Sequence, residues 1–92
     1  MAQVWLFASL KGYAGGRTQF SVPGATIREL IDNLERQFPG IRDALSYEGE
    51  IMPGLAVVVD GEASNLGMLE RVKEDSEVHF LPAIGGGYLT AS

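Results

Sequence analysis

The stretch TIRELIDNLERQF, residues 26–38, decides the fold, because it is the clearest helix in the 92-residue chain. Thr26 and Glu29 have the spacing of a capping box, in which the threonine hydroxyl accepts from the Glu29 amide and the glutamate reaches back. Pro39-Gly40 should end the helix, and Ile41–Leu45 is expected to add one more helical turn. The apolar residues fall at i, i+3, i+4, i+7 and i+11 and form one stripe: Ile27, Leu30, Ile31, Leu34 and Phe38.

The residues before this helix indicate two strands and a loop. Ala2–Ser9 is rich in strand-forming residues and carries no charge, so we expect a central strand with both faces at least partly covered. Leu10–Gly16 contains three glycines and is predicted to be a loop. Arg17–Val22 alternates polar and apolar residues, which predicts a second strand in a hairpin with the first, ended by Pro23-Gly24.

The residues after the helix indicate two further strands. Ser46–Gly54 is predicted to be a loop, and Leu55–Val59 is an unbroken apolar run that reads as a buried strand. The dipeptide Asp60-Gly61 favours a tight turn. Asn65–Lys73 has the spacing of a short helical turn. Glu77–Leu81 is expected to be the last strand, and it leads directly into the glycine-rich end of the chain.

The order strand, strand, helix, strand, turn, strand predicts an α+β fold. One main helix would pack across one face of a mixed four- to five-stranded sheet, because the apolar stripe of the helix needs a sheet face to cover it. We expect the first and last strands to pair at the centre of this sheet. The sequence shows no internal repeat, no linker and no second domain.

The composition excludes several classes of protein. The formal net charge of −5 disfavours contact with a nucleic-acid backbone, which needs a basic surface. The chain has no cysteine, so it has neither a disulfide framework nor a thiolate metal site. It also has a single histidine, His79, for which we expect a surface or packing role and no metal site. No signal peptide or membrane span is visible, and the expected location is the cytoplasm.

Two stretches resemble a known family. LAVVVDGE, residues 55–62, and DSEVHFLPAIGGG, residues 75–87, are similar to the corresponding segments of the ubiquitin-like sulfur carriers of the MoaD/ThiS family. The likeness extends from Val4 to Gly87. Its most specific part is the last strand running through Pro82 into consecutive glycines. The resemblance implies the ubiquitin-like β-grasp fold, and we expect residues 1–87 to form this domain with a flexible glycine tail.

The resemblance also implies that the chain is not an enzyme and binds no cofactor itself. In this family, the carboxylate of the terminal glycine is adenylated by an E1-like enzyme that uses ATP. The carboxylate then becomes a thiocarboxylate, and the sulfur passes to a biosynthetic enzyme that makes molybdopterin, the thiamin thiazole or cysteine. Carried over to this sequence, Gly87 is the activated residue. Gly85, Gly86 and Gly87 form the slim tether that threads into the partner, because glycine lets backbone approach closely.

One feature departs from the family pattern. Five residues, Tyr88–Ser92, follow the last glycine, so the carboxylate of the chain as written belongs to Ser92. One hypothesis is a precursor that a zinc-dependent, JAMM-type protease trims between Gly87 and Tyr88. The alternative is a β-grasp protein that has lost the carrier role and acts only as an interaction module.

The sheet face opposite the helix is the expected docking surface. The strands are apolar on both faces, so this face should keep an apolar patch, and exposed patches of this kind often mark protein contacts. We assign Trp5, Phe7, Phe80 and Pro82 to it. The alternative is that the loop at residues 46–53 folds over this face and covers it.

Overall fold

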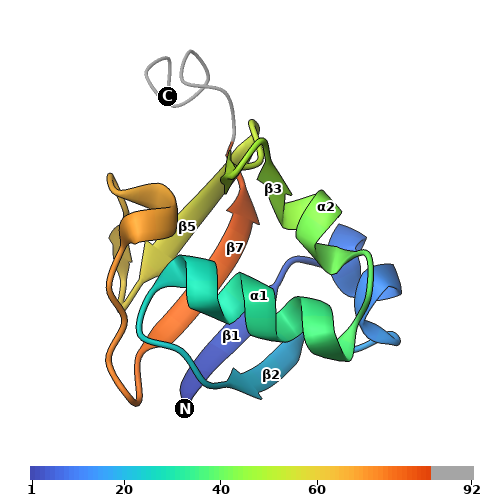
Figure 1. Cartoon of the computed structure of the whole chain (residues 1–92), viewed down its shortest axis with the longest axis horizontal. Helices are drawn as coiled ribbons and strands as arrows, with labels where there is room; N and C mark the ends of the chain where they lie inside the picture. The colour runs from blue at the N-terminus through green and yellow to red at the C-terminus, as the bar shows by residue number, and fades with distance from the viewer. Residues whose placement is uncertain (84–92) are drawn as a thin grey trace.

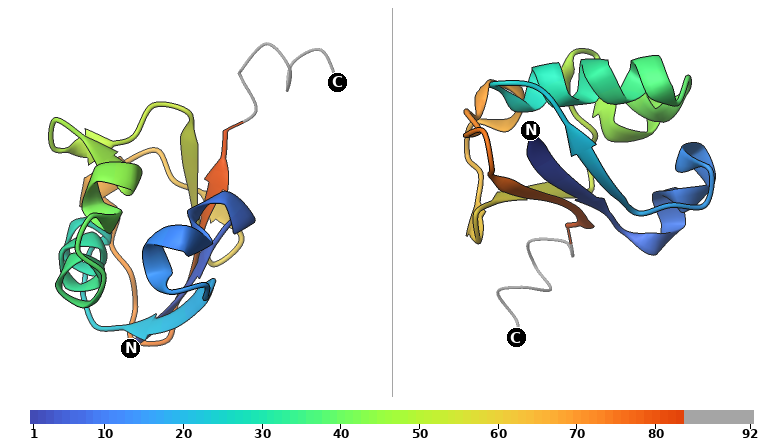
Figure 2. Two further views of the ribbon diagram at one scale, coloured as in Figure 1. Left: turned by 90° about the vertical axis from the view of Figure 1, so that its right-hand side faces the viewer. Right: turned by 90° about the horizontal axis from the view of Figure 1, so that it is seen from below.

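The computed structural model describes residues 1–83 and arranges them in two layers, with a sheet on one side and the helices α1 and α2 on the other (Figures 1 and 2). The sheet strands are β1 (Ala2–Leu6), β2 (Gln19–Val22), β5 (Leu55–Val59), β6 (Glu62–Ala63) and β7 (Glu77–Pro82), and a separate hairpin contains β3 (Ser46–Tyr47) and β4 (Glu50–Ile51). The helices are α1 (Ile27–Gln37), α2 (Ile41–Leu45) and the 3-10 helices η1 (Ala8–Ala14) and η2 (Gly67–Leu69). The predicted α+β architecture is confirmed.

The strand order is β2-β1-β7-β5-β6, which places the first and last strands at the centre. β1 and β7 are parallel, with Val4 opposite Val78 and Leu6 opposite Phe80. β2 pairs antiparallel with β1, and β5 pairs antiparallel with β7. A parallel pair needs a long connection between its strands, and here that connection contains all the helices. The predicted central pairing is confirmed.

Helix α1 begins where the capping box predicts. The Glu29 amide donates to the Thr26 hydroxyl at 3.2 Å. The Glu29 carboxylate accepts at 2.9 Å from the amide of Ala25, one residue before the cap. The stripe residues that face the sheet are all fully buried: Ile27, Leu30, Ile31 and Leu34. The apolar stripe therefore fixes how the helix lies on the sheet.

The short helix α2 depends on a carboxylate from α1. The amide of Arg42 donates to Glu35 Oε1 at 2.8 Å, and the amide of Gly40 donates to both carboxylate oxygens at 3.1 and 3.2 Å. These donors, Arg42 first, lower the pKa of Glu35 below its ordinary value because they stabilise the charged form. Ile41 and Leu45 of α2 are fully buried. The Glu35 carboxylate thus caps the start of α2, and this short helix closes one end of the core.

Two predicted loops contain structure. The first strand ends at Leu6, and residues 8–14 form η1 instead of a strand end and a loop. Leu10 and Ala14 are buried in the core from this helix, which explains its formation. Residues 46–51 contain the hairpin β3–β4 instead of a loop. Sequence patterns missed both because the segments are short and only tertiary burial stabilises them.

Strand β5 is less buried than its composition suggests. Only Val57 is buried, whereas its four neighbours are partly exposed. Ala56 and Val58 point to the sheet face opposite α1, while Leu55 and Val59 point to the core from a strand that has only the two-residue strand β6 on its outer side. The turn to β6 is the predicted one: Asp60 and Gly61 have φ of 51° and 87°, and positive φ at both positions is typical of a type I′ hairpin.

Candidate functional site

The site begins at the end of β7, where the described chain leaves the sheet. Pro82 lies opposite Leu55, and the amide of Ala83 donates to the carbonyl of Gly54 at 2.7 Å. The backbone is therefore held by the sheet as far as Ala83. Residues 84–87 lie between this anchor and the end of the glycine run, and four extended residues span at most about 14 Å. Whatever acts on Gly87 must therefore come close to this end of the sheet.

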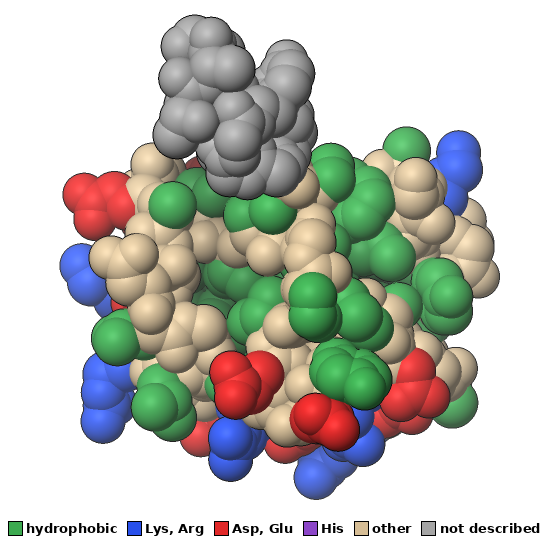
Figure 3. All heavy atoms as spheres, turned by 90° about the horizontal axis from the view of Figure 1, so that it is seen from above, with side chains coloured by type: hydrophobic (Ala, Val, Ile, Leu, Met, Phe, Trp, Pro, Cys, Tyr) green, Lys and Arg blue, Asp and Glu red, His purple; other side chains and the backbone are tan. Residues whose placement is uncertain are grey.

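The predicted tail residues lie outside the described part of the chain. Gly85, Gly86, Gly87 and Tyr88 all follow residue 83, so their predicted roles in threading, activation and cleavage stay predictions. Around the point where the described chain ends, the surface is largely hydrophobic or uncharged, with charged side chains toward the rim (Figure 3). Leu81, which is 39% exposed, and the exposed Pro82 are the last two residues of β7 before this point.

The sheet face opposite α1 carries a row of side chains that crosses every strand. Trp5 of β1 lies opposite His79 of β7, and His79 lies opposite Val58 of β5. The row continues to Gln19 on β2 and Ala63 on β6. Residues directly opposite one another share a sheet face, and His79 alternates with the buried Val78 and Phe80, so the row lies on the outer face. We call this surface the open face.

A stacked pair lies at the centre of the open face. The rings of Trp5 and His79 have centroids 4.7 Å apart and planes inclined by only 4°. Both side chains are partly exposed, and a stacked aromatic pair contributes about 0.5–1.5 kcal/mol beyond its buried area. The pair places two parallel, stacked rings at the centre of the open face. His79 therefore has the packing role that the sequence predicted.

The prediction for this face was right in part about which side chains lie on it. Trp5 is accessible on this face. Pro82 is accessible too, but it occupies a helix-side position of β7 opposite Leu55, and Phe7 is partly buried and packs against the core. Phe80 was placed wrongly, because it is fully buried on the helix side of the sheet. The side chains of β7 alternate between the two faces, and the open-face positions are those of His79 and Leu81. Docking itself stays a prediction.

The loop that was expected as an alternative cover packs elsewhere. Residues 46–51 form the β3–β4 hairpin on the side of α2, away from the open face (Figure 2). Ile51 packs against the core, and the amide of Met52 donates to the carbonyl of Leu45 at 2.9 Å. The hairpin closes the helix layer and leaves the open face uncovered by this segment. The alternative of a covered sheet is therefore wrong.

The start of β7 is held by a network that sequence reasoning missed. Asp60 accepts from the Ser76 hydroxyl at 2.8 Å and from the Glu77 amide at 2.9 Å, while Ser76 is 1% exposed and accepts from the Lys73 amide. The Glu77 amide first, and then the Ser76 hydroxyl, lower the pKa of Asp60. The sequence did contain an indication of this network, because Ser76 is the polar residue between Asp75 and Glu77 in the stretch that resembles the family. This network positions the strand that carries the tail.

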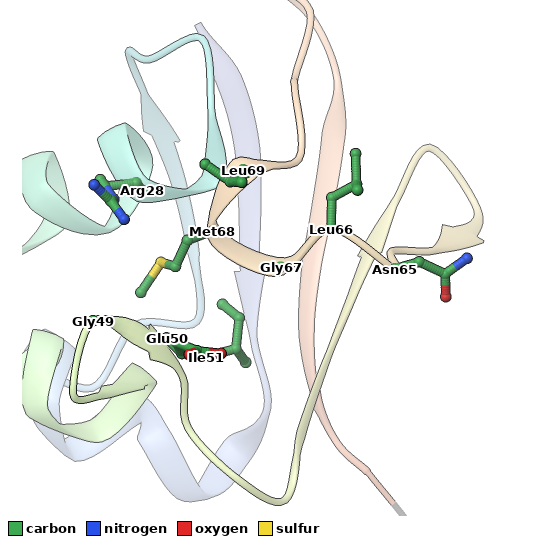
Figure 4. A pocket seen from close by; sticks show the side chains of 9 residues that line it. All are labelled: Arg28, Gly49, Glu50, Ile51, Asn65, Leu66, Gly67, Met68 and Leu69. Carbon is green, nitrogen blue, oxygen red and sulfur yellow. The ribbon is translucent and has the colours of Figure 1, made fainter.

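A cavity of about 490 Å³ lies on the helix side, between α1, β4 and η2 (Figure 4). Met68 of η2 and Ile51 of β4 face each other across it, and its charged lining residues are Arg28 and Glu50. In residues 1–83 there is no group of three His, Asp or Glu side chains placed to hold a metal ion. Within the same residues, no helix is long and apolar enough to cross a membrane.

Comparisons with known proteins agree with this geometry. The profile of the ThiS family matches residues 4–87. The molybdopterin synthase sulfur carrier subunit of Emericella nidulans is 32% identical over 89 residues, which cover 92% of this chain and 96% of that protein. The resemblance noted in the sequence is thus supported by an independent match that ends at the last glycine of the run.

Solved structures of similar proteins share the fold. A chain of the Amycolatopsis orientalis BexX/CysO complex superposes with a TM-score of 0.86 at 29% identity, covering 95% of this chain and 100% of that one. CysO of Mycobacterium tuberculosis gives a TM-score of 0.83 at 25% identity, covering 91% and 100%. SAMP1 of Haloferax volcanii gives 0.70 at 29% identity, covering 94% and 98%. The ubiquitin-like β-grasp fold predicted from the sequence is confirmed.

Proposed function

This chain belongs to the ThiS family, and from this premise we propose a specific route by which its tail carries sulfur. It is a ubiquitin-like protein of the ThiS/MoaD sulfur-carrier type. In the proposed route, residues 88–92 are removed, the Gly87 carboxylate is adenylated by an E1-like enzyme, and the adenylate becomes a thiocarboxylate. One observation carries the proposal: the family match ends at residue 87, just beyond a strand that the sheet holds as far as Ala83.

The first step is hydrolysis of the peptide bond between Gly87 and Tyr88. We assign it to a zinc-dependent, JAMM-type protease, by analogy with the trimming of other ubiquitin-like precursors. Water adds across this bond, so that a new carboxylate forms on Gly87 and the peptide of residues 88–92 leaves with a free amino group on Tyr88. Until then, five additional residues follow the glycine that must enter the partner's active site.

The second step makes this carboxylate reactive. A carboxylate oxygen attacks the α-phosphorus of ATP, pyrophosphate leaves, and an acyl adenylate forms. A sulfur nucleophile at the oxidation level of sulfide then attacks the acyl carbon, and AMP leaves. The product is a thiocarboxylate on Gly87. ATP and the reacting side chains belong to the activating enzyme, so the chain is a substrate and carrier in these reactions.

The chain's own contribution is presentation. The Asp60 network fixes the start of β7, and the Gly54 carbonyl holds its end at Ala83. The glycines beyond have no Cβ and can enter a narrow channel. Ordering them costs conformational entropy on docking, which keeps binding reversible. Reversible binding suits a carrier that must move from the activating enzyme to the enzyme that accepts the sulfur.

The open face is the proposed docking surface for these partners. At its centre are the stacked rings of Trp5 and His79, with Val58 on one side and the polar Gln19 on the other, and Leu81 extends it toward the tail. The relative from Emericella nidulans is named as a subunit of molybdopterin synthase, which favours molybdopterin synthesis as the receiving pathway. Thiamin and cysteine synthesis are the other receiving pathways that the family suggests.

Intact-mass measurement of the protein from its native cells tests the route. We expect loss of Tyr88–Ser92 and, under sulfur demand, the mass increase for one oxygen replaced by sulfur. A second assay uses a chain ending at Gly87 with the E1-like enzyme of its host and measures ATP–pyrophosphate exchange. The 92-residue chain and a chain ending at Gly86 are the matched controls and should be inactive. A chain ending at Gly87 that no host E1-like enzyme adenylates would rule out the proposal.

The same variants separate the carrier from an interaction module. A module predicts that Gly87→Ala leaves function intact and that a charge on the open face, as in Trp5→Glu, abolishes it. The carrier predicts that both variants lose sulfur transfer. Function that survives Gly87→Ala would therefore favour the module.

A further inference from the structure

The outer edge of β5 is only partly paired. β6 pairs with Val58 and Val59, and one further hydrogen bond joins the Ser64 amide to the Val57 carbonyl at 2.8 Å. Beyond this hydrogen bond, no strand in the described part of the chain lies beside Leu55 and Ala56 on the β6 side. The N–H and C=O of one strand residue point to the same side, and residues two apart repeat this direction.

This alternation identifies the backbone groups that have no hydrogen-bond partner among residues 1–83. The Val57 carbonyl points to the β6 side, so the Val57 amide and the Leu55 carbonyl point there too. The Leu55 amide is already bonded to the carbonyl of Met52 at 3.0 Å. One donor and one acceptor are therefore presented at a sheet edge, in the spacing that an added strand would use. An edge of this kind is a template for strand addition.

A groove runs along this edge. It has a volume of about 320 Å³, and its described lining residues, which include Leu55, Val57, Ala63 and Asn65, carry no charge. It adjoins the cavity between β4 and η2, with which it shares Ile51, Asn65 and Gly67. Leu66 and Leu69 of the adjoining segment are 60% and 68% exposed (Figure 4). The edge groove thus combines backbone hydrogen-bonding groups with uncharged pockets, as an extended peptide requires.

The position of the edge groove indicates its occupant. The groove starts at Leu55, next to Gly54, whose carbonyl holds Ala83 at the point where the tail leaves the sheet. A protein that encloses residues 84–87 must cover this corner, because the tail reaches at most about 14 Å beyond it. We propose that an extended, uncharged segment of the activating enzyme adds to the edge of β5 in this groove. The inference rests on the proposed carrier function, since it takes the tail-binding enzyme as the partner.

Hydrogen exchange tests the contact directly. The chain ending at Gly87 is mixed with the host E1-like enzyme and ATP, and exchange of the Val57 amide is compared with that in the free chain. We expect exchange to slow by at least about tenfold in the complex, because the amide gains a partner. A faster or unchanged rate at Val57 in a complex that forms adenylate would overturn the inference and leave the carrier function standing.

A pair of charge variants gives a second measurement. Asn65→Glu places a charge at the rim of the uncharged groove, and Gln37→Glu places the same charge at the exposed end of α1 as the control. Asn65→Glu should weaken binding to the enzyme about tenfold, because a charge in an apolar contact loses hydration without a partner. Gln37→Glu should bind like the unchanged chain. Equal affinity of the two variants would count against the groove.

Two outcomes separate the inference from its premise. If the unchanged chain ending at Gly87 is not adenylated at all, the carrier function fails and the inference fails with it. If exchange at Val57 is slower in the free 92-residue chain than in the free chain ending at Gly87, residues 88–92 themselves occupy the groove. That result would overturn the assignment to the partner enzyme.

Discussion

The two faces of the sheet differ in burial, although neighbouring residues of the same strands form both of them. On the helix side, Val78 and Phe80 of β7 are fully buried against the stripe of α1. On the open face, His79 is partly exposed and Leu81 is 39% exposed. The strand alternation separates these residues in burial. The helix side contains the buried apolar contacts of the domain, and the open face is the surface that we propose for docking.

The largest expected effect is on the helix side. Phe80→Ala should lower the free energy of unfolding by about 3–5 kcal/mol, because it removes a fully buried ring and leaves a cavity. His79→Ala, one residue away, should cost only about 0.5–1.5 kcal/mol through its lost stacking on Trp5. Denaturant unfolding of both variants measures the difference. Equal losses would contradict the division between the two faces.

The helix that covers the buried face should also lose stability when its cap is removed. Thr26→Ala takes away the acceptor of the Glu29 amide and should cost about 0.5–2 kcal/mol. Thermal unfolding followed by circular dichroism gives the value. Thr18→Ala, outside the helix and on a partly exposed side chain, serves as the control and should change stability much less.

The Asp60 network predicts a dependence of stability on pH. The folded state lowers the pKa of Asp60, so its stabilising contribution is present above the unfolded pKa and is lost as the pH falls through the folded pKa. Asp60→Asn retains a side chain that tolerates the positive φ of the turn. We expect the unchanged chain to be the more stable near neutral pH and the two stabilities to converge as the pH falls below the range in which an ordinary aspartate titrates. If the difference in the free energy of unfolding between the two chains does not change with pH, the carboxylate charge is not involved.

The smallest expected effect on stability is on the open face. Leu81→Asp should change the free energy of unfolding by about 1 kcal/mol or less, since the side chain is already accessible. The same variant should lose binding to the activating enzyme, because it puts a charge into the apolar surface beside the tail. Calorimetric titration of a chain ending at Gly87 measures this. A Leu81→Asp variant that binds normally would remove the open face from the docking surface.

Much of the fold was predictable from local pattern. The helix at residues 27–37 was recognisable from its cap and stripe, and the Asp60-Gly61 turn from its dipeptide. The 3-10 helix at residues 8–14 was not recognisable, because its two buried residues, Leu10 and Ala14, make no periodic pattern. Phe80 was assigned to the surface because an apolar strand residue does not reveal which face it will occupy until its neighbours are known.

The sequence by itself determined the family and the position of the glycine run, because the family pattern extends from Val4 to Gly87 and is most specific from Asp75 to Gly87. It also determined the position of the main helix, whose apolar stripe must pack against one face of the sheet. Only the tertiary structure decided which side chains of β7 face the core, how far the sheet holds the chain before the tail, and which edge of β5 lacks a full partner strand among residues 1–83. These properties depend on strand register and on contacts between residues far apart in sequence, and no local pattern contains them.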